Sequence, residues 1–167
     1  MNNLHTIFRS AAAALGLACS CQAVPAAGAS VVISGMSGLY LETSIQSRRD
    51  LCVTRFKDSQ AAWTGTMAHW KQRNASVLED LRAIAERLEG APHPGGSGNE
   101  AAASLLQFKL MAALAPAGNL APLVDEQAAR VCAQWLSDLE PAGKVEQALP
   151  VLLDSARKLQ PVTRQAR

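Results

Sequence analysis

Eight positions between residues 58 and 88 follow one another at alternating intervals of four and three, and this repeat constrains the fold more than any other feature of the chain. They are Trp63, Met67, Trp70, Asn74, Val77, Leu81, Ile84 and Leu88. Such spacing keeps one side of an α-helix facing a neighbouring helix, and Asp58 or Ser59 can cap its start. At 1.5 Å per residue, a helix of about thirty residues is roughly 45 Å long. We therefore expect one long central helix in an α-helical body.

Helical spacing of apolar residues recurs on both sides of this segment. The further expected helices cover residues 39–56, 100–114, 122–139 and 145–159. Glycine and proline clusters separate them, and the longest, GAPHPGGSGN at 90–99, predicts an exposed loop. Alanine and leucine dominate the apolar fraction while aromatic residues make up only 4% of the chain, which favours helices over sheets. The sequence predicts an all-α up-and-down helical bundle of about four to five helices, with one domain over 30–160 and a tail at 161–167.

The first 29 residues have the three parts of a cleaved secretory peptide. His5 and Arg9 precede an apolar run at 11–18, and small residues then offer cleavage sites after Ala23 or Ala29. The apolar run is about eight residues long, much shorter than the roughly 20 that span a bilayer. We expect residues 1–29 to be a signal peptide and flexible leader, and the protein to be periplasmic or secreted without a membrane span.

An alternative interpretation makes Cys19 or Cys21 the lipidated first residue of a lipoprotein. Glycine stands at Gly16, where a lipidation sequence usually has leucine, and the residues before Cys21 also fit imperfectly. In this case acyl chains, rather than a helix, would hold the protein at the membrane surface. The two interpretations predict different N-terminal residues in the mature protein.

Cys52 and Cys132 are the cysteines that remain once such a signal is removed. An even pair in an oxidising compartment predicts one disulfide bond. Closing a loop of about 80 residues would stabilise the fold by roughly 4 kcal/mol on a chain-entropy estimate. The alternative is two unrelated buried thiols, since free cysteine is often buried. If the bond forms, it joins the first and fourth expected helices.

Candidate contact residues come from the aromatic and thioether side chains. Trp63, Met67, Trp70 and Trp135 are candidates for an interaction or ligand surface, because such groups suit flat apolar molecules. Side chains of this kind at helical spacing more often belong to a core, which is the interpretation that we favour. Asn74, the polar member of the repeat, either fixes the helix register through buried hydrogen bonds or lies at an exposed edge.

No motif for catalysis, a cofactor or a metal stands out. His69 and His93 belong to no cluster with metal-ligand spacing, and no haem-attachment motif is present. Ser155 and Lys158 match a Ser-x-x-Lys pattern, but its companion elements are missing. The net charge of +2 falls to +1 without Arg9, which disfavours a nucleic-acid partner. We expect no enzyme, no cofactor and no metal site.

These features favour a non-enzymatic exported protein that contacts a periplasmic or envelope protein. The helix at 58–88 and the loop at 90–99 are the first candidate surface, because loops on rigid scaffolds commonly carry binding. The long apolar repeat is equally suited to a homodimer interface. An alternative of another class is a carrier of a small apolar ligand held between the helices. A hydrolase using Ser155 and Lys158 is a third hypothesis.

Overall fold

The computed structural model describes residues 34–90 and 99–159, and helices account for nearly all of them. The elements are α2 (Leu41–Arg55), the 3-10 turn η1 (Lys57–Ser59), α3 (Gln60–Arg73), α4 (Ala75–Gly90), α5 (Asn99–Leu120), α6 (Asp125–Ser137) and α7 (Lys144–Arg157). A further short helix at 34–39 precedes α2. The all-α class predicted from the sequence is confirmed. The described helices outnumber the expected four to five, because the expected helix at 58–88 is divided into α3 and α4 and residues 34–39 form a further short helix.

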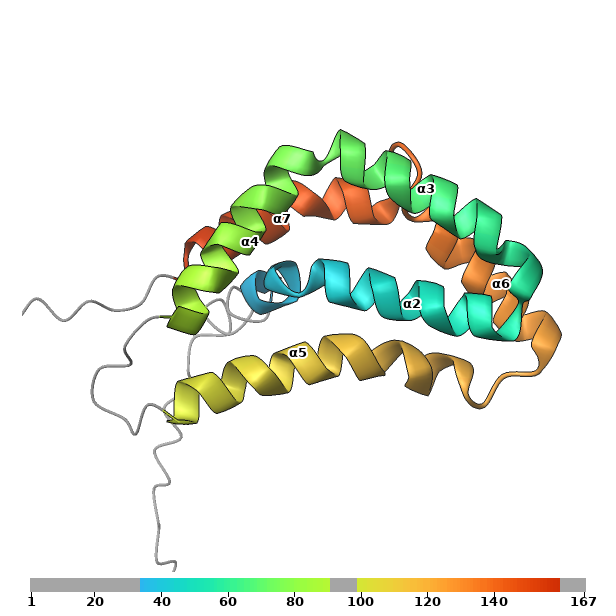
Figure 1. The fold of residues 1–167 in the computed structure, drawn as a ribbon, viewed down its shortest axis with the longest axis horizontal. Helices are drawn as coiled ribbons and strands as arrows, with labels where there is room; N and C mark the ends of the chain where they lie inside the picture. Colours follow the sequence, from blue (N-terminus) through green and yellow to red (C-terminus); the bar gives the residue numbers. More distant parts are fainter. Residues whose placement is uncertain (1–33, 91–98, 160–167) are drawn as a thin grey trace, which may run out of the picture.

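Four rods alternate in direction along the chain (Figure 1). α2 runs across the molecule, and α3 and α4 return above it as one arched rod. α5 then runs beside α2 in the same direction, and α6 and α7 return behind. α2 packs against α5, α6 and α3, while α4 packs against α7. α2 is therefore the central rod, and α5 lies at the edge of the molecule.

The expected long helix at 58–88 is wrong as a single straight element. It divides at Asn74, whose backbone dihedrals (φ −110°, ψ 18°) lie outside the helical region. The backbone bonds continue across the break, from the Asn74 N–H to the Trp70 carbonyl and from the Leu78 N–H to the Asn74 carbonyl. The buried Asn74 amide also donates to the Trp70 carbonyl at 3.0 Å and to Glu146 at 3.2 Å. α3 and α4 therefore form one rod with a bend at Asn74, and the side-chain hydrogen bonds of Asn74 stabilise this bend.

The boundaries around α5 also differ from the expectation. The helix predicted at 100–114 continues to Leu120, with Pro116 inside it. Proline removes one helical hydrogen bond, but Pro116 is buried, so packing offsets that loss. The next helix begins at Asp125 instead of Pro122, because Val124 has an extended backbone (φ −69°, ψ 160°).

The core lies between α2, α3 and α6. Trp63 and Trp70 are almost fully buried there with Ile45 and Leu78. The predicted disulfide between Cys52 and Cys132 is present, with a Cα–Cα distance of 5.8 Å, and it joins α2 to α6. A second cluster of buried residues joins α4 to α7: Leu81, Ile84, Leu149 and Ala156. Among the described helices, none combines the length and apolar character needed to cross a membrane.

Several expectations lie outside the described residues. They are the signal peptide and leader at 1–29, lipidation of Cys19 or Cys21, most of the loop at 90–99, and the tail at 161–167. The stretch at 30–38 is rich in small residues and broken by glycines, a pattern that suits a strand or, more readily, a lead-in without regular structure. Its described part is helical from residue 34, and Gly35 and Gly38 lie close to Ser155 and Leu152 of α7.

Candidate functional site

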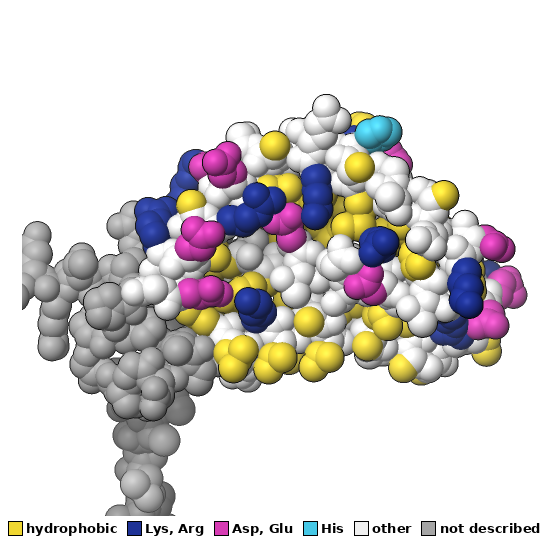
Figure 2. Space-filling view, in the orientation of Figure 1, with side chains coloured by type: hydrophobic (Ala, Val, Ile, Leu, Met, Phe, Trp, Pro, Cys, Tyr) yellow, Lys and Arg dark blue, Asp and Glu magenta, His cyan; other side chains and the backbone are white. Residues whose placement is uncertain are grey.

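Four large apolar side chains lie on the outer side of α5 and are exposed to solvent. Their exposed fractions are 57% for Leu106, 52% for Leu110, 59% for Met111 and 64% for Leu114. The three leucines follow one another at intervals of four, so they share one side of the helix. We call these four residues the α5 stripe. A space-filling view shows a row of apolar side chains along the lower edge of the molecule, where α5 runs (Figure 2).

The α5 stripe is unusual because its helix carries almost no charge. From residue 104 to Leu120, Lys109 is the single charged residue. The exposed side of α4, by contrast, carries charges throughout, including Glu79, Arg82 and Glu86. Helices that are apolar on all sides are normally covered on all sides. α5 packs chiefly against α2, so the described part of the chain leaves one apolar side of α5 uncovered.

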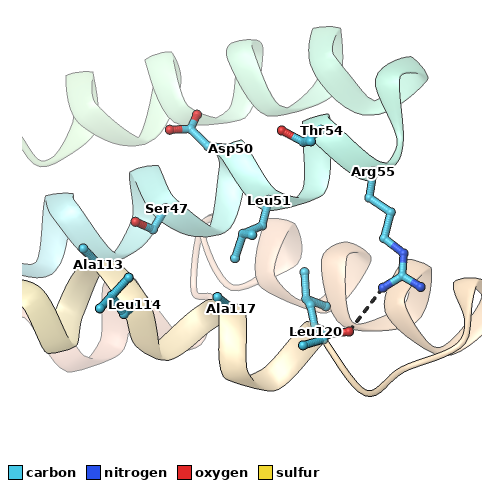
Figure 3. A pocket seen from close by; sticks show the side chains of 10 residues that line it. Ser47, Asp50, Leu51, Thr54, Arg55, Ala113, Leu114, Ala117 and Leu120 are labelled. Atoms are coloured by element: carbon cyan, nitrogen blue, oxygen red, sulfur yellow. Dashed lines mark hydrogen bonds between the residues drawn. The ribbon is translucent and has the colours of Figure 1, made fainter.

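A groove between α2 and α5 adjoins the stripe, with a volume of about 550 Å³. α2 lines it with Ser47, Asp50, Leu51, Thr54 and Arg55, and α5 and the residue after it line it with Ala113, Leu114, Ala117, Leu120 and Ala121. The close-up shows Leu51 of α2 pointing toward Ala117 of α5, and Ser47 lying near Ala113 (Figure 3). Asp50 and Thr54 lie on the side of α2 away from α5. Leu114 belongs to both the stripe and the groove. The two features therefore form one continuous surface.

Arg55 fixes the end of this groove. Its guanidinium donates to the Leu120 carbonyl at 3.2 Å, drawn in Figure 3, and to the Leu123 carbonyl at 2.7 Å. It also pairs with Asp125 at 2.7 Å. One side chain at the end of α2 thus satisfies two backbone carbonyls at the α5–α6 link and contacts the first turn of α6. Nothing near Arg55 in the sequence indicates partners 65 to 70 residues away, so this role could not be predicted from the sequence.

A second, smaller hollow of about 240 Å³ lies where the start of α2, the end of α4 and α5 meet. Tyr40 is buried there, and its hydroxyl donates to Glu89 at 3.3 Å. Burial, followed by the negative charge of Glu89, raises the pKa of Tyr40 to about 12. The phenol therefore stays protonated near neutral pH and serves as a hydrogen-bond donor. Leu106 of the stripe and Lys109 also line this hollow.

Charged pairs elsewhere hold the rods together. Glu42 of α2 pairs with Arg82 of α4 at 2.7 Å and with Lys71 of α3 at 3.5 Å. The hydrogen bonds from Arg82 hold the pKa of Glu42 below its ordinary value. Glu146 of α7 accepts hydrogen bonds from Arg73 and Asn74, and these lower its pKa as well. These contacts are structural, and they lie away from the groove.

The candidate residues of the sequence analysis lie mainly in the core. Trp63, Met67 and Trp70 are buried, and Trp135 is partly buried with the Arg48 guanidinium 5.3 Å from its ring centre. The two described hollows are lined by other residues. The structure therefore brings Trp63, Met67 and Trp70 together, but it does so inside the bundle.

The other singled-out residues are two histidines and the pair Ser155 and Lys158, which a backbone bond joins from the Lys158 N–H to the Ser155 carbonyl at 3.2 Å. Ser155 is buried in α7, while Lys158 bonds to Asp154 at the end of that helix. His69 is exposed on α3, and His93 lies outside the described residues. Within 34–90 and 99–159, no three histidine, cysteine or acidic side chains gather in a way that suits a metal ion.

Comparisons with protein-family models, with curated proteins and with solved structures each found no match to this chain. The candidate site therefore rests on the geometry of α2 and α5. Sequence reasoning missed it, although one signal was available. Leu105, Leu106, Phe108, Leu110, Met111 and Leu114 surround α5 on every side instead of following one stripe. This pattern indicates a helix that needs neighbours on more than one side.

Proposed function

We propose that this protein is an exported helical interaction module that contacts another polypeptide through the α5 stripe and the adjoining groove. The single observation that carries the proposal is the uncovered apolar side of α5, with four large side chains more than half exposed. Exposed apolar patches of this kind on soluble proteins commonly mark interaction sites. We therefore propose α5 as the contact surface, in place of the helix at 58–88 and the loop at 90–99 that the sequence favoured.

The size of the stripe limits how tightly it can bind. Fully burying a leucine or methionine side chain is worth about 1.5–3 kcal/mol, and these four are already about half buried. Covering the stripe alone would then gain about 3–6 kcal/mol before the cost of association. A specific complex therefore needs the groove as well. A helix laid along the stripe, with one side chain in the groove, would use both.

The exported location is part of the same proposal. It is supported by the N-terminal pattern at residues 1–29 and by the Cys52–Cys132 bond, since disulfides persist in oxidising compartments. The non-enzymatic character rests on the sequence, which lacks a recognisable catalytic or cofactor motif. Sequencing the N-terminus of the purified protein tests the export. A start at Val24 or Ser30 supports cleavage, and a retained Met1 contradicts it.

Site-specific photo-crosslinking tests the contact surface. A photoreactive phenylalanine analogue at Leu110 is expected to form a covalent adduct with a polypeptide in cells that export the protein. The matched control places the same analogue at Val151, which is 63% exposed on α7, away from the stripe. Adducts at 110 that are missing at 151 support the proposal. Equal adducts at both positions, or none at either, reject α5 as the contact.

A second candidate function is a carrier of a small apolar ligand, now placed in the α2–α5 groove instead of among the tryptophans. The observation that favours it is the volume of about 550 Å³, within the range of about 300–1,000 Å³ typical of ligand pockets. Native mass spectrometry of the protein from its own compartment tests it. A bound mass that disappears in Ala117→Trp, which fills the groove, supports the carrier, and bare polypeptide in both cases rejects it.

A further inference from the structure

We propose that α4, α7 and the short helix at 34–39 form a lid, hinged to the rest of the bundle, whose opening enlarges the apolar contact surface at the start of α5. The closed lid borders the hollow of about 240 Å³ that Leu106 of the stripe lines. This inference rests on the proposed function, because it concerns the regulation of the same surface.

The described chain passes between the lid and the rest of the bundle at three breaks with non-helical backbone. Tyr40 (φ −110°, ψ 20°) stands between the helix at 34–39 and α2, and Asn74 (φ −110°, ψ 18°) stands between α3 and α4. Ala142 (φ 62°) lies in the loop between α6 and α7. Hinges are a few residues at the ends of elements that absorb changes in the backbone angles. Each of these three connections therefore contains a residue that suits a hinge.

Two carboxylates show that the three breaks lie close together in space. Glu146 accepts hydrogen bonds from Asn74 and from the Ala142 N–H, so it joins two of them. Glu42 follows the third break, at Tyr40, by two residues, and it pairs with both α3 and α4 on the two sides of the bend. A rotation at this level would move the lid while α2, α3, α5 and α6 stay together.

The buried side chains divide at the same level. The core between α2, α3 and α6, which holds the disulfide, takes only the first turns of the lid helices, through Leu78 of α4 and Val145 of α7. Beyond those turns, α4 and α7 lie side by side and pack against each other through the second cluster (Figure 1). Arg157 of α7 also pairs with Asp80 of α4 at 2.7 Å. Only Leu41 packs against both clusters. The lid helices therefore share a core of their own and are expected to move as one body.

One hydrogen bond closes the lid far from the hinge. The Tyr40 hydroxyl donates to Glu89 in the last turn of α4, roughly 20 Å along that helix from the bend. Glu89 forms the lid side of the hollow, and α5 forms another side, to which Leu105 and Leu106 contribute. Leu105 is partly buried in the closed form. Opening separates Glu89 from Tyr40 and uncovers Leu105, so a partner that contacts Leu105 as well as the stripe favours the open lid.

Distances between two spin labels, measured by double electron–electron resonance, test the lid in the full chain. A ketone-bearing phenylalanine analogue carries each label, so no cysteine is added beside the disulfide. The lid pair is Glu86 on α4 with Gln107 on α5, and the reference pair is Gln107 with Ala129 on α6; these three positions are exposed. We expect two distance populations for the lid pair and a single narrow one for the reference pair.

Tyr40→Phe tests the closing hydrogen bond, because it removes the donor to Glu89 and keeps the ring. The ratio of the longer to the shorter population is expected to rise about threefold to tenfold. Thr66→Val is the matched control, since it removes a hydroxyl-to-carboxylate hydrogen bond of the same length, 3.3 Å, from α3 to Glu140 outside the lid. This control is expected to leave the ratio unchanged.

The outcomes separate this inference from the proposed function. A single narrow population for the lid pair overturns the lid, whereas photo-crosslinks at Leu110 would still support the interaction module. Equal broadening of both pairs contradicts a hinge at this level. A ratio that is the same in Tyr40→Phe and the unaltered protein overturns the role of the Tyr40 hydroxyl. Two populations without any adduct at Leu110 support the hinge and reject the contact surface that it would regulate.

Discussion

Glu146 joins three parts of the molecule through one carboxylate. It accepts from Arg73 at the end of α3 at 3.0 Å, from Asn74 at the bend at 3.2 Å, and from the Ala142 N–H of the α6–α7 loop at 3.0 Å. Arg73 also donates to the Leu139 carbonyl at 2.8 Å. Glu146 therefore links the bend between α3 and α4 to the loop between α6 and α7.

The lowered pKa of Glu146 makes this junction sensitive to acid. The hydrogen bonds from Arg73 and then Asn74 hold its pKa below the ordinary value of 4.5. The charged form thus stabilises the fold above about pH 4.5, and this contribution is lost as the pH falls through the folded pKa. Glu146→Gln is expected to lower the melting temperature at neutral pH, and the difference from the unaltered protein is expected to shrink toward pH 3.

Thermal unfolding followed by circular dichroism between about pH 3 and pH 7 measures this effect. Glu126→Gln is the control, because Glu126 is 82% exposed and pairs only within its own helix, with Arg130. A difference between Glu146→Gln and the unaltered protein that stays constant over the whole range would contradict the role assigned to the carboxylate.

Arg55 has the same kind of role at the α5–α6 link. Arg55→Ala removes the donors to the Leu120 and Leu123 carbonyls, and it is expected to lower the free energy of unfolding by about 1–2 kcal/mol. Arg49→Ala, which removes only an exposed pair with the adjacent Asp50, is expected to change it by less than about 0.5 kcal/mol. Urea unfolding of both variants measures the difference, and equal losses would argue against the link.

At the scale of elements, the repeat from Trp63 to Leu88 correctly indicated which side of the rod is buried. It could not indicate the bend, because polar residues occur in straight helix seams as well. The two alternatives for Asn74 were a buried polar contact and an exposed edge, and the structure has it buried with hydrogen bonds. Its partner Glu146 lies 72 residues away, and no local pattern indicates such a contact.

Helix ends depend on contacts in the same way. The APAG run at 115–118 reads locally as a stop, yet α5 continues through it because Pro116 is buried in the packed body. The candidate site likewise depends on how the helices pack against each other. The sequence shows that α5 is apolar, but only the arrangement of the rods shows which of its sides is left uncovered.

The α6–α7 loop gives a prediction at this scale. Gly143 has an ordinary φ of −67°, but an added Cβ would lie 2.7 Å from the Asp138 carbonyl carbon and 2.8 Å from the Glu140 oxygen. Gly143→Ala is therefore expected to destabilise the fold by about 1–3 kcal/mol. Gly65→Ala in α3, where an added Cβ meets nothing within 4 Å, is expected to stabilise it by about 1 kcal/mol.

Melting temperatures of these two variants are expected to move in opposite directions. The neighbouring Ala142 has a φ of 62°, in the left-handed region that favours glycine. Ala142→Gly is thus expected to raise the stability by roughly 1 kcal/mol. A lower melting temperature for Ala142→Gly, or a higher one for Gly143→Ala, would contradict this view of the loop.

For the whole molecule, the disulfide between α2 and α6 is a covalent cross-link between side chains of two helices far apart in the sequence. It joins residues separated by 80 positions, so its removal is expected to cost roughly 4 kcal/mol through the larger entropy of the unfolded chain. Urea unfolding of Cys52→Ala/Cys132→Ala against the unaltered protein measures this cost. The double variant leaves neither Cys52 nor Cys132 as a lone thiol, and a loss below about 1 kcal/mol would show that packing alone holds α2 to α6.

The position of α5 at the edge of the molecule has a consequence for local unfolding. α5 packs chiefly against α2, and its outer side has no neighbour in the described chain. Segments with few buried contacts open at a smaller free-energy cost than the rest of a protein. Deuterium should therefore enter the backbone amides of residues 104–120 earlier than those of α2. A second molecule lying along that flank would slow the uptake there first.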